Sequence, residues 1–110
     1  MNKYGNKKTV VGDMEFDSKH EAQRYIELML LVRAHQIDDL QRQVPFELIP
    51  RQSAPDGKVV RPVNYVADFV YKNHWTGEMV VEDAKGFMTT EYKIKKKMMY
   101  HKYGIWVREV

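Results

Sequence analysis

The spacing of hydrophobic and polar residues divides this chain into short alternating stretches and two longer stretches of helical period. Residues 9–11 and 14–16 are largely apolar runs separated by Gly12 and Asp13, a pair typical of a hairpin turn. Residues 18–35 carry apolar side chains three and four positions apart, which is the period of a helix. Because apolar positions cover much of this helix, we expect it to be well buried.

The remainder of the chain is typical of strands arranged around a second helix. Strands are expected at residues 37–49, 59–71, 78–84 and 105–110. Residues 50–58 contain Ser, Pro, Asp and Gly and are expected to form a loop, and a turn is expected at 73–77. Pro45 favours an edge position or a bulge for the strand that carries it.

The second helix is expected to begin after Thr89 or Thr90, to run to about Lys102 and to end before Gly104. The order of elements is therefore a hairpin, a helix, two or three strands, a helix and a strand. This order predicts an α/β fold in which helices flank a mixed central sheet.

Length and composition limit what the chain can be. With 110 residues and 44% hydrophobic content, we expect one domain over residues 1–110, with residues 1–8 flexible. There are no cysteines, which excludes disulfides, thiolate metal sites and cysteine nucleophiles and suits a reducing cytoplasm. The chain shows neither an apolar signal core nor a run that could span a bilayer, so we expect a cytoplasmic protein without a membrane partner.

Two aspartates and a lysine in strand-forming segments are the best candidates for chemistry. Asp68 interrupts a strand rich in Val, Tyr and Phe, where a charge is costly unless it is paired or bound to a metal. Asp83 and Lys85 are two positions apart and share a face of a strand, whereas Glu82 faces away and is assigned a salt-bridge or supporting role. Two carboxylates at close range repel unless a cation lies between them. Oxygen ligands favour Mg²⁺ or Mn²⁺, and an ion held this way can promote phosphodiester hydrolysis.

Each of these acids also has a purely structural explanation. Glu21 lies three residues after Ser18, the spacing of a helix capping box, and this role is compatible with Glu21 acting as a third carboxylate at the metal. Asp68 could end a strand or face solvent at a sheet edge. Asp83 and Lys85 could form a surface ion pair that contributes little to stability.

Positive charge is concentrated shortly after the acidic segment. The formal net charge of the chain is +3. The basic cluster consists of Lys93, Lys95, Lys96, Lys97 and Lys102. Such a cluster favours a polyanion, here DNA. The structural alternative is a solvated lysine face on a helix whose apolar side is formed by Ile94 and Met98.

The order of Glu21, Asp68 and then Asp83-Ala84-Lys85 resembles the PD-(D/E)xK nuclease superfamily. The resemblance extends over the whole chain. It implies a restriction-endonuclease-like αβββαβ core that follows a short N-terminal hairpin.

Within that superfamily the chain most resembles small phage-encoded endonucleases and Holliday-junction-resolvase-like proteins. The closer likeness is carried by residues 16–22, 81–86 and 103–105. The chain departs from the superfamily pattern at Ala67, where a proline is usual. It also has Lys96 four residues before Tyr100, where some branches have glutamine.

The resemblance implies metal-dependent cleavage of DNA that is structure-selective and serves phage recombination, repair or processing. Asp68, Asp83 and the Ala84 carbonyl would hold Mg²⁺ or Mn²⁺, with Glu21 as a further ligand. Lys85 would position the attacking water or offset charge in the transition state. The implied partners are DNA and a second copy of the chain, because a resolvase cuts two symmetric strands. No small-molecule cofactor is implied.

Two other functions fit the same residues. A nucleic-acid-binding or recombination accessory protein could keep the fold without cutting, and it would bind DNA without metal-dependent turnover. A protein-interaction module could carry the acids as surface charge, and it would show no salt-sensitive DNA binding.

Overall fold

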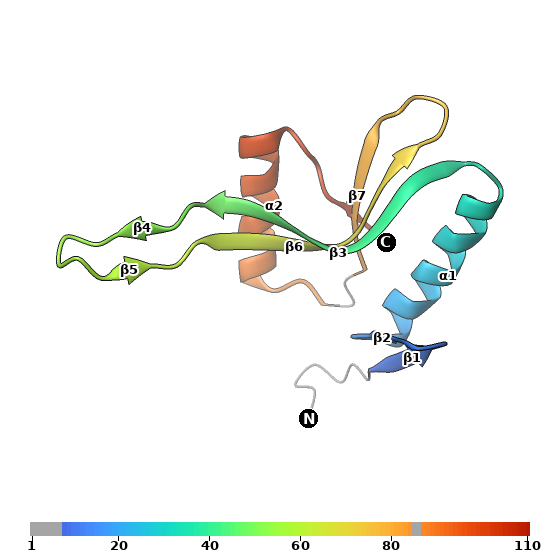
Figure 1. Cartoon of the computed structure of the whole chain (residues 1–110), viewed down its shortest axis with the longest axis horizontal. Helices are drawn as coiled ribbons and strands as arrows, with labels where there is room; N and C mark the ends of the chain where they lie inside the picture. Colours follow the sequence, from blue (N-terminus) through green and yellow to red (C-terminus); the bar gives the residue numbers. More distant parts are fainter. Residues whose placement is uncertain (1–7, 85–86) are drawn as a thin grey trace.

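The computed structural model describes residues 8–84 and 87–110, which form a mixed α/β fold (Figure 1). Its helices are α1 (Lys19–Arg33) and α2 (Thr90–Tyr103). Its strands are β1 (Thr9–Val11), β2 (Met14–Phe16), β3 (Ile37–Ile49), β4 (Gln52–Ser53), β5 (Val59–Val60), β6 (Val63–Asn73), β7 (Met79–Asp83) and β8 (Arg108–Glu109). The predicted N-terminal hairpin and both helices are confirmed, whereas residues 1–7 of the segment expected to be flexible lie outside the described residues.

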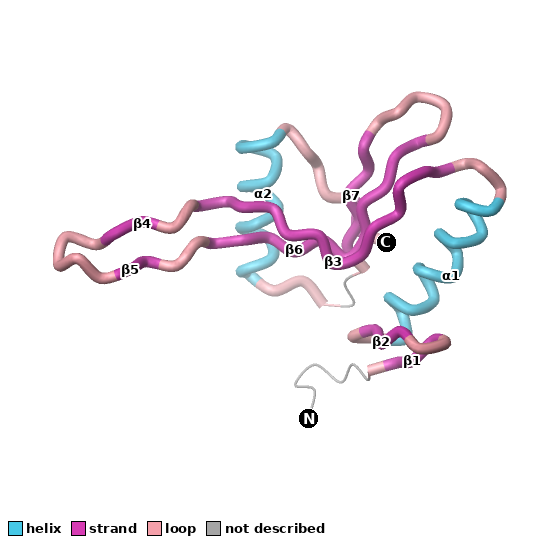
Figure 2. The backbone as a smooth tube through the Cα atoms, viewed as in Figure 1, coloured by secondary structure: helices cyan, strands magenta, loops and turns pink. Residues whose placement is uncertain are grey.

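The central sheet has the strand order β3-β6-β7-β8 and is mixed, as predicted (Figure 2). Strand β6 pairs antiparallel with both β3 and β7, whereas β7 and β8 run parallel. A parallel pair requires a crossover, and α2 provides it. Strand β3 lies at one edge of this sheet, in agreement with the edge position that Pro45 favours.

Side-chain caps explain where the helices begin. Ser18 Oγ accepts a hydrogen bond from the Glu21 N–H at 3.1 Å, and Thr89 Oγ1 accepts one from the Tyr92 N–H at 3.0 Å. These contacts satisfy amide groups that the first turn of a helix leaves without partners. Gly104 ends α2 in the left-handed conformation, with a φ of 69°, which glycine adopts without strain.

Each helix packs on its own hydrophobic cluster. Leu28 of α1 is buried with Phe69 and Tyr71 of β6. Tyr92 and Met99 of α2 are buried in a second cluster with other side chains of β6 and β7. The sheet therefore separates two cores, and elements of both cores hold the residues that were predicted to be functional.

Strand β6 changes the face that its side chains present near its middle. Strict alternation predicts Tyr65, Ala67, Phe69 and Tyr71 on one face, but the first two belong to the α2 cluster and the last two to the α1 cluster. The cause lies where β3 carries Gln43 in the left-handed conformation, with a φ of 52°, while the ladder on either side keeps its register.

The segment predicted as a loop at residues 50–58 contains the two-residue strand β4 and the turn at the tip of a projecting hairpin, so that prediction is correct in part. Strand β4 pairs with β5, and the ladder registers on both sides set Pro50 opposite Pro62. Neither proline has an N–H to donate, so the main ladder stops there and the predicted strand at 59–71 is divided in two. We call residues 50–62 the arm; it projects from the body at the left of Figure 1.

The arm gives the molecule an elongated shape. The principal extents are 54 × 39 × 24 Å and the radius of gyration is 16.0 Å. A compact domain of this length has a radius of gyration of about 13 Å. The difference is consistent with a hairpin that projects from the body of the domain.

The C-terminal strand is shorter than the predicted segment 105–110. Only Arg108 and Glu109 pair with β7, opposite Glu82 and Asp83. Val107 is buried in the α2 cluster before the ladder begins, so packing rather than strand pairing holds the start of this segment. Within the part of the chain that the structure describes, no helix is long and apolar enough to cross a membrane.

Candidate functional site

The two predicted strand acids lie in neighbouring strands, Asp68 in the middle of β6 and Asp83 at the end of β7. Phe69 pairs with Glu82 in the antiparallel β6–β7 ladder, and extending this register by one pair sets Asp68 opposite Asp83. Asp83 is completely buried and Asp68 is 9% exposed.

The Asp68 carboxylate bridges two strands. Its Oδ2 accepts a hydrogen bond from the Ala84 N–H at 2.9 Å, and its Oδ1 accepts one from Gln43 Nε2 at 3.2 Å. Ala84 thus contributes its backbone amide to this site, while its predicted role as a carbonyl ligand stays a prediction. Lys85, the predicted catalytic lysine, lies outside the described residues.

Asp83 is held by a tyrosine that the sequence analysis did not single out. The Tyr65 hydroxyl donates to Asp83 Oδ2 at 2.5 Å, inside the cluster that α2 covers. Burial, followed by the charge of Asp83, raises the pKa of Tyr65 well above its ordinary value, so this hydroxyl remains a donor at physiological pH. No sequence signal distinguished Tyr65 from the other aromatic residues of its strand.

Glu21 brings a third carboxylate to the site from the start of α1. It is 2% exposed, and its backbone N–H makes the capping contact with Ser18. Its side chain turns toward the sheet, where Oε2 accepts a hydrogen bond from Gln43 Nε2 at 3.0 Å. The two interpretations of Glu21 that the sequence left open, helix start and site acid, are therefore compatible.

Gln43 is the central residue of the site that sequence reasoning missed. One side-chain nitrogen donates to both Glu21 and Asp68, and so links α1 to β6. A glutamine in an alternating strand carries no functional signal, and its left-handed backbone is evident only in the structure. Because Gln43 is an exposed residue, its amide can leave the two carboxylates without unpacking the core.

The electrostatic environment of Glu21 opposes its ionisation. Burial is the largest cause, the negative charge of Asp68 the next, and together they raise the pKa of Glu21 to about 7. The Arg42 guanidinium, 3.9 Å from Glu21 Oε2, counteracts this effect in part. Additional positive charge placed beside Glu21 would favour the ionised form of its carboxyl group.

The carboxylate oxygens of the site suit a hard divalent cation such as Mg²⁺. The side chains are not arranged as a closed coordination shell. Among residues 8–84 and 87–110, no group of three or more His, Cys, Asp or Glu residues is positioned to hold a metal ion. Gln43 Nε2 occupies the space between the Glu21 and Asp68 carboxylates. Carboxylate oxygens are the ligands that Mg²⁺ prefers, so the residues fit the ion by chemistry, and binding would require the amide to move aside.

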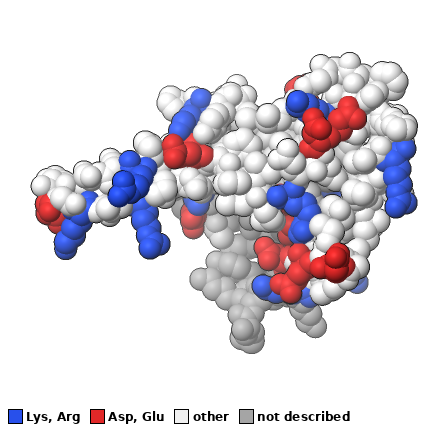
Figure 3. All heavy atoms as spheres, viewed as in Figure 1, with Lys and Arg blue, Asp and Glu red and all other residues white. Residues whose placement is uncertain are grey.

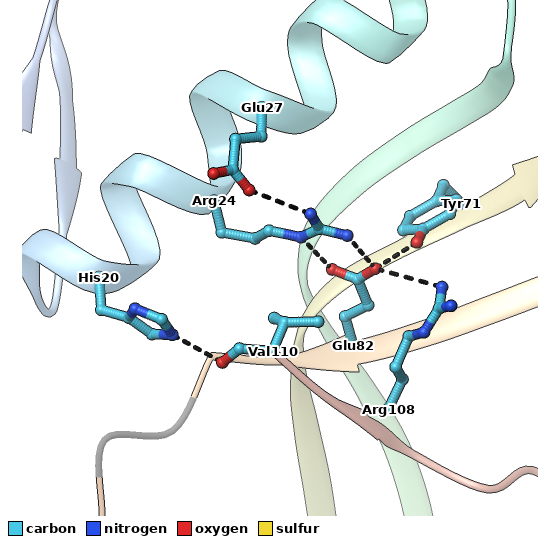
Figure 4. A network of polar contacts seen from close by, with 7 residues as sticks. All are labelled: His20, Arg24, Glu27, Tyr71, Glu82, Arg108 and Val110. Carbon is cyan, nitrogen blue, oxygen red and sulfur yellow. Dashed lines mark hydrogen bonds and ion pairs between the residues drawn. The ribbon is translucent and has the colours of Figure 1, made fainter.

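Glu82 has the salt-bridge role that its position in the strand predicted, and that prediction is confirmed (Figure 4). Glu82 is fully buried, and Arg24 donates from Nε to Oε1 at 2.8 Å and from a terminal nitrogen to Oε2 at 2.7 Å. The Tyr71 hydroxyl also donates to Oε2. Glu82 precedes Asp83 in β7 and Arg24 follows Glu21 by three positions, so this pair fixes α1 against the strand that carries the site.

The lysines of α2 differ in whether their ammonium groups are already engaged within the protein or can contact a polyanion. Lys95 pairs with Glu91 at 3.0 Å, and Lys96 pairs with Glu109 at 2.8 Å while lying 4.4 Å from the Trp106 ring centroid. These two predicted DNA contacts are therefore already engaged within the protein.

The other lysines of the predicted cluster also differ in whether the protein already engages them. Lys102 donates to the Glu47 carbonyl at 2.9 Å, whereas Lys93 and Lys97 are exposed one turn apart on α2. Ile94, expected on the apolar side, is 52% exposed, so that expectation was wrong. Lys93 and Lys97 are the exposed members of the predicted DNA-binding face that form no ion pair or side-chain hydrogen bond with the residues the structure describes.

Comparison with known proteins gives one family match. The model of the family described as "Protein of unknown function (DUF1064)" matches residues 1–108. Neither the curated proteins nor the solved structures gave a match.

Proposed function

The chain belongs to the DUF1064 family, and from the buried carboxylates of Glu21, Asp68 and Asp83 we propose that it is a metal-dependent endonuclease that hydrolyses DNA phosphodiester bonds. The observation that carries this proposal is the register of β6 and β7, which sets Asp68 opposite Asp83, together with the Gln43 amide that links Asp68 to Glu21. Glu21, Asp68 and Asp83 come from distant parts of the sequence, and all three are buried. Buried carboxylates are costly without cations, and this cost supports a cation-binding role.

The proposed architecture is the restriction-endonuclease-like αβββαβ core. The order α1, β3, β6, β7, α2, β8 and the mixed sheet support it. In this proposal the hairpin of β1 and β2 precedes the core, and the acids lie where β6 and β7 meet the start of α2.

In the proposed mechanism, Asp68 and Asp83 hold a divalent cation, with Glu21 as an additional ligand. When bound, the cation acts as a Lewis acid on the phosphate and lowers the pKa of a coordinated water. The residues of this chain would hold the cation and position the scissile phosphate beside it. Tyr65 keeps the Asp83 carboxylate in place. Lys85 is assigned to the charge that develops on the phosphate oxygens.

The proposed function is tested by a cleavage panel of four-way junction, flap, duplex and single-stranded DNA with Mg²⁺, Mn²⁺ or EDTA. The informative variant is Asp83→Asn, because the asparagine oxygen can still accept from Tyr65 while the negative charge is lost. The matched control is Asp13→Asn, in the exposed turn between β1 and β2. We expect the wild type and the control to cut only with the metal and Asp83→Asn to be inactive but folded. Metal-dependent cleavage by Asp83→Asn at the wild-type rate would contradict the assignment.

A second function, DNA binding without cleavage, is favoured by the position of Gln43. An amide that already satisfies Glu21 and Asp68 gives these acids a partner other than a metal. A non-cutting accessory protein would bind DNA equally well in Mg²⁺ and EDTA. It would also show no cleavage of any substrate in the panel.

A further inference from the structure

We propose that the arm, residues 50–62, inserts into the major groove of duplex DNA and makes a second nucleic-acid contact distinct from the carboxylate site. This inference rests on the proposed function for its ligand class, DNA. The shape of the arm, its charge and its projection from the rest of the protein support this role.

The tip of the arm is a well-defined turn rather than a loose loop. The Gly57 N–H donates to the Ala54 carbonyl at 2.9 Å, and the Ala54 N–H donates to the Lys58 carbonyl at 2.8 Å. Asp56 Oδ1 accepts from the Lys58 N–H at 3.0 Å, and Gly57 has a φ of 83°. A three-residue Pro-Asp-Gly loop closed in this way pre-organises the hairpin, which lowers the entropy lost on binding.

The base of the arm is held by the body of the protein. The Glu47 carbonyl, three residues before the arm, accepts from Lys102 Nζ at 2.9 Å and from the Tyr103 hydroxyl at 2.5 Å. The Tyr103 ring also packs edge-on against Phe46, with ring centroids 5.8 Å apart. The last turn of α2 therefore fixes the direction in which the arm projects.

The arm carries cations that the protein does not neutralise. Its charged residues are Arg51, Lys58, Arg61 and Asp56, which give a net charge of +2. The ladder register sets Arg51 opposite Arg61, and like charges in facing positions are destabilising. Within the described ranges, no acidic side chain forms an ion pair with any of the three cations, whose charges Figure 3 shows along the projecting end.

The cations lie on both faces of the ribbon, so both faces can contact the phosphates that line the two edges of a DNA groove. Strand alternation places Arg51 and Arg61 on one face of the ribbon and Lys58 on the other. A major groove about 12 Å wide accepts a two-stranded ribbon and has phosphates along both of its edges. Val59 and Val60 are 54% and 41% exposed, and such side chains can contact thymine methyl groups. The groove of A-form RNA is too narrow for the ribbon, so the chemistry favours DNA.

A second copy of this chain is a poorer occupant for the same surface. Two arms would bring together net positive charges, and Pro50 and Pro62 remove donors that strand exchange between arms would use. Charge complementarity with a polyanion is therefore the stronger argument.

The test measures binding of a labelled 30-base-pair duplex in EDTA, at salt concentrations from 50 to 200 mM, so that cleavage plays no part. The arm variant Arg51→Gln/Arg61→Gln is compared with Arg33→Gln/Lys72→Gln, an equal charge change at exposed positions away from the arm. For the arm variant we expect affinity to fall on the order of tenfold or more and the salt slope to become shallower by about 2, while the control keeps the wild-type values. A single-stranded oligonucleotide of the same sequence should show a smaller difference, because it has no groove.

Four results would overturn the inference. Equal losses in the arm and control variants would indicate a general charge effect, and equal losses on single-stranded and duplex DNA would exclude the groove. A wild type that does not bind duplex, or an arm variant that changes only the oligomeric state in sedimentation, would also overturn it. A wild type that binds through the arm but never cuts in the cleavage panel would refute the nuclease and leave the arm in place.

Discussion

Arg24 contacts both carboxylate oxygens of Glu82, although the two residues are 58 positions apart in the sequence and Glu82 is fully buried. This contact joins the helix that carries Glu21 to the strand that carries Asp83. It also keeps the pKa of Arg24 above its ordinary value, chiefly through the hydrogen bonds to Glu82. The relative position of the site acids therefore depends on a charged pair that takes no part in the proposed chemistry.

The first prediction concerns this pair. Arg24→Met should lower the free energy of unfolding by about 3–5 kcal/mol, because it removes both guanidinium hydrogen bonds of a buried carboxylate and leaves it the more distant Arg108, whose Nη1 lies 4.0 Å from Oε2. Chemical denaturation measures the change. The control is Glu27→Gln, which removes the other partner of Arg24 at a half-exposed position and should cost less than about 1 kcal/mol. Equal effects of the two substitutions would mean that the buried pair does not hold α1 against β7.

The second prediction concerns the amide between the acids. Gln43→Ala and Gln43→Gly both remove the donor shared by Glu21 and Asp68, and each should lose about 2 kcal/mol of stability in EDTA from that cause. The alanine variant should lose about 1 kcal/mol more, since the left-handed backbone at this position suits glycine. Thermal melts with added Mg²⁺ should show a larger rise in Tm for either variant than for the wild type. A Tm that never responds to Mg²⁺ in any of the three proteins would argue against a cation between these acids.

The third prediction concerns pH. The pKa of Glu21 is raised to about 7 by burial and by Asp68, so the fold disfavours the ionised carboxylate. The free energy of unfolding should therefore fall as pH rises from the unfolded pKa of about 4.3 through 7. In EDTA, Glu21→Gln should be more stable than the wild type at pH 8 by up to about 3 kcal/mol, since one pKa unit corresponds to about 1.4 kcal/mol. At pH 4 the difference should vanish. A difference that is the same at pH 4 and pH 8 would contradict this account of the site.

The fourth prediction separates the two kinds of lysine on α2. Lys93→Gln/Lys97→Gln should weaken DNA binding and make its salt slope shallower by about 2, because these exposed side chains are available to phosphates. Lys95→Gln/Lys96→Gln, with the same charge change, should affect binding less and should lower the Tm, because Lys96 pairs with Glu109. Fluorescence anisotropy and thermal melts measure the two effects. Equal losses of affinity would mean that the internal ion pairs do not keep Lys95 and Lys96 from DNA.

Local signals in the sequence were sufficient for the helices and for the hairpin of β1 and β2. Ser18 and Thr89 are side-chain caps, Gly104 is a helix stop, and the Gly12-Asp13 turn falls between β1 and β2. These features depend on residues within a few positions of one another. For this reason the periodicity of the chain and its capping residues were enough to predict them.

The arm and the site depended on contacts between distant residues, which the sequence pattern does not contain. Ser, Pro, Asp and Gly at residues 50–58 are equally typical of a loop and of a hairpin tip, and only pairing with β5 distinguishes the two. The change of face in β6 follows from the left-handed Gln43 on β3, and no neighbour of Gln43 in the sequence indicates that conformation. The acids were found because charges in apolar strands are unusual, whereas Gln43 and Tyr65 are ordinary residues for a strand.

The facing prolines at residues 50 and 62 have a consequence for how this protein can be altered. Since the hydrogen-bonded ladder is interrupted there, fraying of the distal ribbon does not have to spread into the sheet that carries the acids. The ribbon can then be shortened, lengthened or exchanged for another hairpin while both hydrophobic clusters stay packed. Changes to the arm, and so to what the protein recognises, can therefore be made without lowering the stability of the part that carries the carboxylates.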